Sequence, residues 1–270
     1  MKTKLENYKN FLVNIRRSLV YYNYLCPLFD YLLEKNIDYY IMTKEQLAQY
    51  FSDKKYSPNA INSVIKSCRS FCKFDNVIEH SCFQIKLLEI DQKDPKYITY
   101  EELLQGIKYY ATYNTRGMPT LKCNAVLKFL FFTGIRKGEL FTLKREKIDF
   151  VNCAVSIWGQ KDKTDRTVYF PDTIIKDLTD YFNSEPEGDK GAFNITPPEL
   201  TYLVKKIGKY LNKDISPHIL RHSSATYMTR KNISPLVMQR ILGHNSLATT
   251  LIYARPDDKL AQEIYKKQIG

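Results

Sequence analysis

The chain has 270 residues, of which 44% are hydrophobic, so it can bury a sizeable core and is not intrinsically disordered. Its 41 Lys and Arg residues against 29 Asp and Glu residues give a net charge of +12, which favours a polyanionic partner but leaves DNA and RNA open. Its apolar runs are shorter than the roughly 20 residues that span a membrane, so we expect no membrane partner.

Six cysteines are scattered along the sequence, and the first residues carry charges where a signal peptide would have an apolar core. We therefore expect a reduced, cytoplasmic protein. Cys68, Cys72, His80 and Cys82 form the one local group of metal-ligating side chains in the sequence, but their spacings differ from those of the usual zinc motifs. We interpret them as buried thiols and expect no metal.

The first ninety residues have the apolar periodicity of packed helices. A capping box of Thr43 and Gln46 predicts one helix start, and Ser57 followed by Pro58 predicts the next. The second of these helices is apolar on one side and basic on the other, where it carries Lys66, Arg69 and Lys73. We interpret the basic side as a DNA-binding face, although an ordinary solvated face has the same pattern.

The best domain boundary is a polar segment, Asp91 to Lys96, that contains Pro95. A second capping box, Thr99 with Glu102, begins a new apolar run directly after it. We therefore divide the chain into a helical domain at 1–93, a linker at 94–98 and a second domain at 99–270.

The second domain is predicted to be mixed. Helical patterns cover 99–113, 120–132 and 138–144, and they return from Ile174 to the end of the chain. Two β-prone runs, 155–158 and 167–170, flank a polar tip, which predicts a hairpin. The predicted fold class is mainly α with a small antiparallel sheet, arranged as a helical N-terminal domain followed by an α+β domain.

Three segments of the second domain combine cations, histidines and a late tyrosine. Arg136 follows Gly134 at a junction between two predicted helices, where a guanidinium can face a phosphate beside helix-terminal amides. His218 and Arg221 share a helix face, a pattern that a polar surface helix explains equally well. His244 precedes Tyr253 by nine residues.

The order and spacing of these segments resemble the tyrosine recombinase (phage integrase) family, in its compact, Xer-like two-domain form. The resemblance covers 99–270 closely. It extends more loosely to the N-terminal domain, where the helix from Ser57 to Phe74 looks like the core-binding helix of the family. The catalytic residues that it implies are Arg136, Lys163, His218, Arg221, His244 and Tyr253. Lys161 lies on the same predicted tip as Lys163, so it stays an alternative for the catalytic lysine and is otherwise assigned to DNA binding.

The resemblance also implies the role of each catalytic residue. Tyr253 would attack a DNA phosphorus, with His218 helping to remove its proton and Lys163 protonating the leaving 5′-oxygen. The two arginines and His244 would hold the non-bridging oxygens, so no metal and no other cofactor is needed.

The function implied is that of a site-specific recombinase, which cleaves and rejoins double-stranded DNA through a 3′-phosphotyrosyl intermediate and exchanges strands via a Holliday junction. The expected assembly is a homotetramer on two DNA sites, in which a C-terminal helix packs against a neighbouring subunit. We expect the protein to be associated with the nucleoid and to have accessory proteins as possible further partners. An inactive DNA-binding module and a type IB-like topoisomerase are the alternatives. The sequence leaves open whether the reaction serves integration, excision or dimer resolution.

Overall fold

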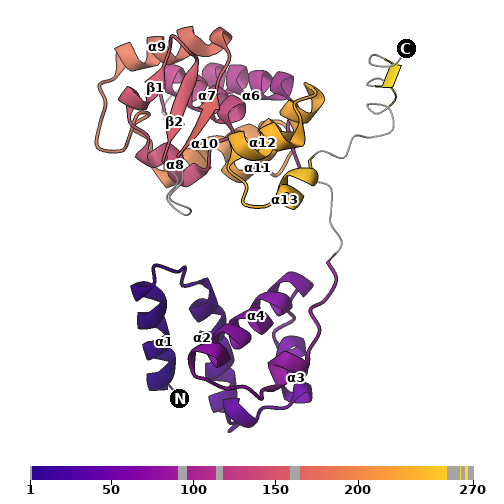
Figure 1. Ribbon diagram of the computed structural model, residues 1–270. Helices are drawn as coiled ribbons and strands as arrows, with labels where there is room; N and C mark the ends of the chain where they lie inside the picture. Colours follow the sequence, from indigo (N-terminus) through magenta and orange to yellow (C-terminus); the bar gives the residue numbers. More distant parts are fainter. Residues whose placement is uncertain are drawn as a thin grey trace. The chain divides into compact units, whose positions relative to one another are not determined.

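The computed structural model describes residues 2–90, 96–113, 118–158 and 165–253, together with residues 262, 265 and 266. The chain separates into two compact units, Met1–Lys93 and Asp94–Gly270, each with its own hydrophobic core (Figure 1). The predicted fold class is confirmed, because the described ranges are mainly helical and contain one three-stranded antiparallel sheet. None of the helices in these ranges is long and apolar enough to span a membrane.

In the part of the first unit that the structure describes, all the regular elements are helices. Its elements are α1 (Lys2–Asn14), α2 (Val20–Glu34), η1 (Tyr39–Ile41), α3 (Lys44–Asp53), α4 (Pro58–Phe74) and α5 (Ser81–Gln84). Helices α2 and α4 pack against each other, and the rings of Phe29, Tyr39 and Phe71 meet between these elements with centroids 4.8 to 5.4 Å apart. Aromatic burial of this kind supplies much of the core of a small helical domain.

Both predicted helix starts in this unit are confirmed. Thr43 and Gln46 bond reciprocally at 2.9 and 3.3 Å, and the Ser57 hydroxyl accepts the backbone N–H of Ala60 with Pro58 in the first helical position. The apolar side of α4 is buried and the side with Lys66 and Lys73 is exposed.

The second unit contains more elements. In chain order they are α6 (Tyr100–Tyr113), α7 (Thr120–Thr133), α8 (Lys137–Thr142), η2 (Arg145–Lys147), β1 (Ile148–Asp149), β2 (Ala154–Ile157), β3 (Arg166–Tyr169), η3 (Asp172–Ile174), α9 (Ile175–Ser184), α10 (Pro197–Tyr210), α11 (Pro217–Arg230), α12 (Pro235–Leu242) and α13 (Leu247–Leu251). Helix α6 begins at the predicted capping box, where Thr99 and Glu102 bond reciprocally at 2.9 and 3.2 Å.

Helix α7 forms the centre of this unit. It packs against α6, α9 and α11, and its buried residues lie on all sides of the helix. A helix that is apolar all round belongs in a core rather than on a surface. The C-terminal end of α7 is thereby fixed in place, and it is from this end that the chain turns into α8.

The sheet has the order β1–β2–β3 and is antiparallel throughout. Val155 pairs with Val168, and both side chains are buried. Each strand of the hairpin begins one residue earlier than predicted, because Ala154 pairs with Tyr169 and Arg166 pairs with Ile157. Helix α8 likewise ends at Thr142 rather than at 144, since the backbone at Leu143 is extended.

Two glycine turns lie side by side at the ends of α7 and α12. Gly134 and Gly243 have φ angles of 59° and 63°, a left-handed conformation that glycine adopts at little cost. A Cβ on Gly134 would lie 2.7 Å from the Leu242 side chain, and one on Gly243 would lie 2.9 Å from the Arg166 side chain. These close approaches let α8, β3, α11 and α12 converge on one place.

Candidate active site

Arg136 is the first of three arginines that lie where α8, β3, α11 and α12 converge, and it is the N-cap residue of α8. Its backbone N–H donates to Oε2 of Glu139 at 2.7 Å, and its Nη1 donates to Oε1 of the same carboxylate at 3.1 Å. Its Nη2 donates to the carbonyl of Gly243. The side chain is 38% exposed, so a ligand can reach it.

Arg221 of α11 is the buried cation of the site. Its Nη1 donates to the carbonyl of Gly134 at 2.5 Å, and its Nη2 donates to the carbonyl of Leu242 at 2.6 Å. Burial, together with the positive charges of Arg136 and Arg166, lowers the pKa of Arg221 to about 10, which still leaves it charged at neutral pH. A guanidinium has five N–H groups, so two carbonyls do not exhaust its donors.

A third arginine and one carboxylate complete the charged network. Arg166, the first residue of β3, donates from Nη1 and Nη2 to the two oxygens of Glu139 at 2.8 and 2.7 Å, and from Nε to the carbonyl of Ile241 at 2.9 Å. Burial alone would raise the pKa of Glu139, but the bonds from Arg166 and from the Arg136 backbone outweigh it and hold the pKa below its usual range. Glu139 therefore offsets part of the charge of two arginines.

Three histidines and Tyr253 lie beside these cations. Nδ1 of His222 is hydrogen-bonded to the hydroxyl of Tyr253, and the ring of His222 lies 4.2 Å from that of His218 on the preceding turn of α11. Nδ1 of His244 lies 2.9 Å from the hydroxyl of Thr250, which is buried. The rings of His244 and Tyr253 are 6.3 Å apart.

The environment keeps these imidazoles neutral. Burial lowers the pKa of both His222 and His244 to about 4, helped by nearby positive charges that include Arg221. Burial also raises the pKa of Tyr253, with Arg221 acting in the opposite direction. A neutral imidazole bonded to a protonated phenol is an arrangement from which a proton can be transferred.

A cavity of about 380 Å³ opens next to the arginines. Its lining residues are Arg136, Lys137, Gly138, Ser216, Pro217, His218 and Arg221. Two guanidinium groups, one ammonium group and an imidazole around one hollow suit a phosphate group of a larger ligand.

The structure brings Arg136, His218, Arg221, His244 and Tyr253 to this place, as the sequence motifs suggested. Lys161 and Lys163 lie outside the described residues. In the first unit, Lys66 and Lys73 are exposed on α4.

Two contacts bear on the sequence-based assignments of Arg69 and His218. Arg69 is not free on the basic side of α4, because Nε and Nη2 donate to the carbonyls of Cys82 and Ile85 at 3.0 and 2.6 Å. The histidine at the Tyr253 hydroxyl is His222 rather than His218, because His222 lies one turn further along α11 and reaches the tyrosine, whereas His218 lines the cavity.

Sequence reasoning also missed Glu139 and Arg166. His222 was recognisable in principle, since it lies four residues after His218 and therefore on the same helix face. The pairing of Glu139 with Arg166 joins residues 27 positions apart, and no local pattern signals it.

Comparison with known proteins identifies the family. Residues 97–259 match the phage integrase family. The chain belongs to the phage integrase family. A tyrosine recombinase of Thermosipho africanus is 30% identical over 217 residues, covering 77% of this chain and 75% of the relative. Tyrosine recombinase XerA of Pyrococcus furiosus is 28% identical over 223 residues, covering 79% and 76%.

Solved structures share the fold. The XerH site-specific recombinase bound to its difH substrate, in a pre-cleavage complex, matches with a TM-score of 0.70 and 21% identity over 93% of this chain and 78% of that chain. A lambda integrase dimer bound to a core site matches with a TM-score of 0.70 and 13% identity over 96% of each chain. With its family and named relatives, the chain is a site-specific tyrosine recombinase.

Acidification is expected to lower the free energy of unfolding of the second unit between about pH 6.5 and about pH 4. The pKa values of His222 and His244 are ordinarily 6.5 and are about 4 in the folded chain, so in this range only the unfolded chain takes up these protons. The stabilisation that the two neutral histidines give the folded chain is complete above pH 6.5 and is lost as the pH falls toward 4. Urea denaturation at a series of pH values, followed by the fluorescence of the single tryptophan, Trp158, measures it.

The double variant His222→Asn, His244→Asn is the control. Its stability should depend less on pH above about pH 5, where carboxylates remain ionised. The same pH dependence in both proteins would contradict the assignment of neutral, buried imidazoles.

Proposed function

We propose that the chain recombines duplex DNA through a covalent link to Tyr253. The observation that carries the proposal is the hydrogen bond between the Tyr253 hydroxyl and the neutral His222, with Arg221 nearby and a cation-lined cavity alongside. DNA as the partner is supported by the structural relatives, among them XerH bound to difH and lambda integrase bound to a core site.

The reaction proposed exchanges one phosphodiester for another. The Tyr253 oxygen attacks phosphorus, the bond to the 5′-oxygen breaks, and a 3′-phosphotyrosyl link and a free 5′-hydroxyl result. The attack requires a base because burial keeps the phenol protonated, and His222 is placed to accept the proton. Attack by a 5′-hydroxyl on the phosphotyrosine reverses the step, so the reaction needs no nucleotide cofactor, and the cationic side chains are proposed to stabilise the phosphate without a metal.

The cations have separate tasks in this scheme. Arg136 and Arg221 hold the non-bridging oxygens with the N–H groups that their carbonyl and carboxylate partners leave over. His218 lines the same cavity and donates to the phosphate, and His244 adds a further donor. Glu139 and Arg166 act on Arg136 rather than on DNA, because they fix the position of its guanidinium.

Lys163 is proposed to protonate the leaving 5′-oxygen. It lies three residues before Arg166, which is bonded to Glu139 beside Arg136. Lys161 lies five residues before Arg166 on the same predicted tip and is proposed to bind the DNA backbone, with the role of general acid as its alternative.

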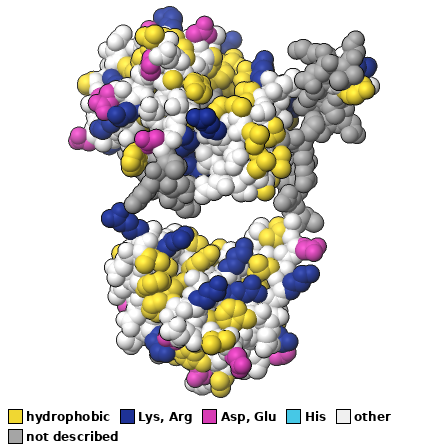
Figure 2. Space-filling model, in the orientation of Figure 1, with side chains coloured by type: hydrophobic (Ala, Val, Ile, Leu, Met, Phe, Trp, Pro, Cys, Tyr) yellow, Lys and Arg dark blue, Asp and Glu magenta, His cyan; other side chains and the backbone are white. Residues whose placement is uncertain are grey.

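DNA contacts of the first unit are proposed for the exposed side of α4. Lys66 and Lys73 point to solvent there, and Figure 2 shows Lys and Arg side chains gathered on the visible face of this unit. Phosphate contacts by lysines position a protein on DNA without reading sequence. Arg69 stabilises the unit through its two carbonyl bonds and is left out of this surface.

The proposed assembly is a homotetramer that joins two DNA sites and exchanges strands via a Holliday junction. This would place the protein at the nucleoid, with accessory proteins as further partners. Of the predicted packing helix at the C-terminus, 257–268, the structure describes only residues 262, 265 and 266, so Leu260 and Ile264 lie outside the described residues.

Tyr253→Phe should bind DNA as the wild type does and form no covalent adduct, because only the attacking oxygen is removed. Nicked suicide duplexes that carry candidate sites, analysed on a denaturing gel, measure the adduct, and gel shifts measure binding.

Arg136→Ala should keep binding DNA but cleave it at least about 100-fold more slowly. A rate loss of this size is usual when one hydrogen-bond donor to a developing negative charge is removed.

The alternatives give other outcomes. Adduct formation by Tyr253→Phe would place the nucleophile elsewhere. Specific binding without any wild-type adduct would indicate an inactive DNA-binding module, and relaxation of supercoils without recombinant products would indicate a topoisomerase.

Lys163→Ala should slow cleavage of ordinary DNA and be rescued by DNA with sulfur in place of the bridging 5′-oxygen at the cut site. A thiolate leaves without a proton, so the general acid is no longer needed. Single-turnover cleavage rates on both substrates test this, with Lys161→Ala as the matched control. Rescue of Lys161→Ala instead would exchange the roles of the two lysines.

A further inference from the structure

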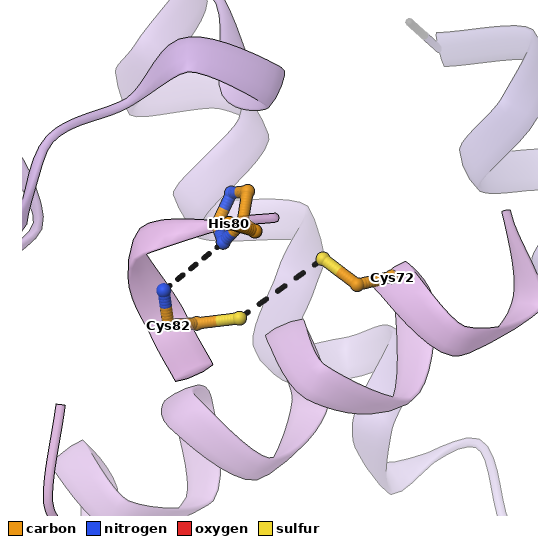
Figure 3. A group of neighbouring side chains, drawn as sticks. All are labelled: Cys72, His80 and Cys82. Atoms are coloured by element: carbon orange, nitrogen blue, oxygen red, sulfur yellow. Dashed lines mark hydrogen bonds between the residues drawn. The ribbon is translucent and has the colours of Figure 1, made fainter. Parts of the chain in front are cut away.

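Three metal-ligating side chains from the first unit converge inside its core. Cys72 comes from the last turn of α4, and His80 and Cys82 come from the start of α5 (Figure 3). One ligand atom of each, two sulfurs and an imidazole nitrogen, lies within 4.8 Å of the others, and all three residues are buried. Seven residues lie between Cys72 and His80, and one lies between His80 and Cys82. These spacings differ from those of the usual zinc motifs, so it is the fold that brings the three side chains together.

The imidazole of His80 is already oriented as a metal ligand would be. Its Nε2 lies 2.8 Å from the carbonyl of Tyr39, and a carbonyl only accepts, so Nε2 carries the proton. Nδ1 then carries the electron pair of the ring, which accepts the backbone N–H of Cys82 at 3.1 Å, and a bound metal ion would take the place of this hydrogen bond. Metal-bound histidines commonly donate their second nitrogen to a backbone carbonyl in this way. The ring also stacks on Tyr39, with centroids 4.6 Å apart, which fixes its plane.

The two sulfurs have a separation that suits a tetrahedral ion. They lie 4.0 Å apart, too far for a disulfide. Two thiolates bound to Zn²⁺ at about 2.3 Å in tetrahedral geometry would be about 3.8 Å apart. Two thiolates also balance the charge of a divalent cation, so a buried complex with the neutral imidazole carries no net charge.

We propose that Cys72, His80 and Cys82 bind a zinc-like divalent cation that ties the end of α4 to α5. Two further polar groups border the site. The Tyr39 hydroxyl lies 3.4 Å from Sγ of Cys72, and Cys68 is buried one turn earlier on α4. A closed structural zinc site requires four ligands, and of these two groups only the Cys68 thiol is of a type that such sites use. The ion would stabilise the unit through α4, the helix that also bears Lys66 and Lys73.

Cobalt binding to the full-length, fully reduced chain tests the proposal. The wild type should bind one Co²⁺ with the visible bands of a tetrahedral ion and the near-ultraviolet charge transfer of thiolate ligands, and Zn²⁺ should displace it. Cys72→Ser and Cys82→Ser should each lose more than about 100-fold in affinity, beyond the loss typical of a group outside the ligand set. Cys26→Ser, a half-buried thiol of the same unit, should bind as the wild type does.

Controls keep the result decisive. Circular dichroism shows whether each variant folds. Zn²⁺ should raise the melting temperature of the wild type, and this measurement does not depend on whether the variants fold. Absence of a tetrahedral spectrum in the folded, reduced wild type would overturn the proposal. So would unchanged binding in the Cys72→Ser, Cys82→Ser double variant, or a Cys72–Cys82 disulfide in freshly purified protein, detected as a mass lower by two hydrogens.

Discussion

The second unit depends on one buried guanidinium. Arg221 donates to the carbonyls of Gly134 and Leu242, and so joins the end of α7 to the end of α12 through α11. Arg136 follows one of these ends and His244 follows the other. The same side chain that faces the phosphate cavity therefore also sets where the other groups lie. Left-handed glycines at both ends let the backbones approach closely enough for a single arginine to span them.

The charges of the site are unbalanced in a way that suits its chemistry. Arg136, Arg166 and Arg221 surround one carboxylate, Glu139, so positive charge remains for a phosphate to neutralise. Burial first, and then the same field, lowers the pKa of the neighbouring histidines, so these imidazoles are unprotonated at ordinary pH. The positive charge that favours an anion therefore also helps to keep these imidazoles unprotonated.

Local sequence signals predicted most of the helices but few of the contacts in the site. The capping boxes at Thr43 and Thr99 depend on residues three positions apart, and both helices begin where these predict. The bond of Arg166 to Glu139 depends instead on how β3 packs beside α8. The hydrogen bonds of Arg69 to two carbonyls depend on the path of the chain after α4. The family resemblance supplied the candidate catalytic residues together, although each motif alone was ambiguous.

Hydrogen exchange of an Arg221→Lys variant tests the organising role of this residue most directly. Lysine keeps the charge but has no planar fork, so it cannot hold both carbonyls at once. Faster exchange than in the wild type is predicted for peptides covering 134–140 and 243–250, with α10 unchanged as the internal reference. Equal exchange in the two proteins would show that the turns hold their positions without Arg221, and would contradict the account.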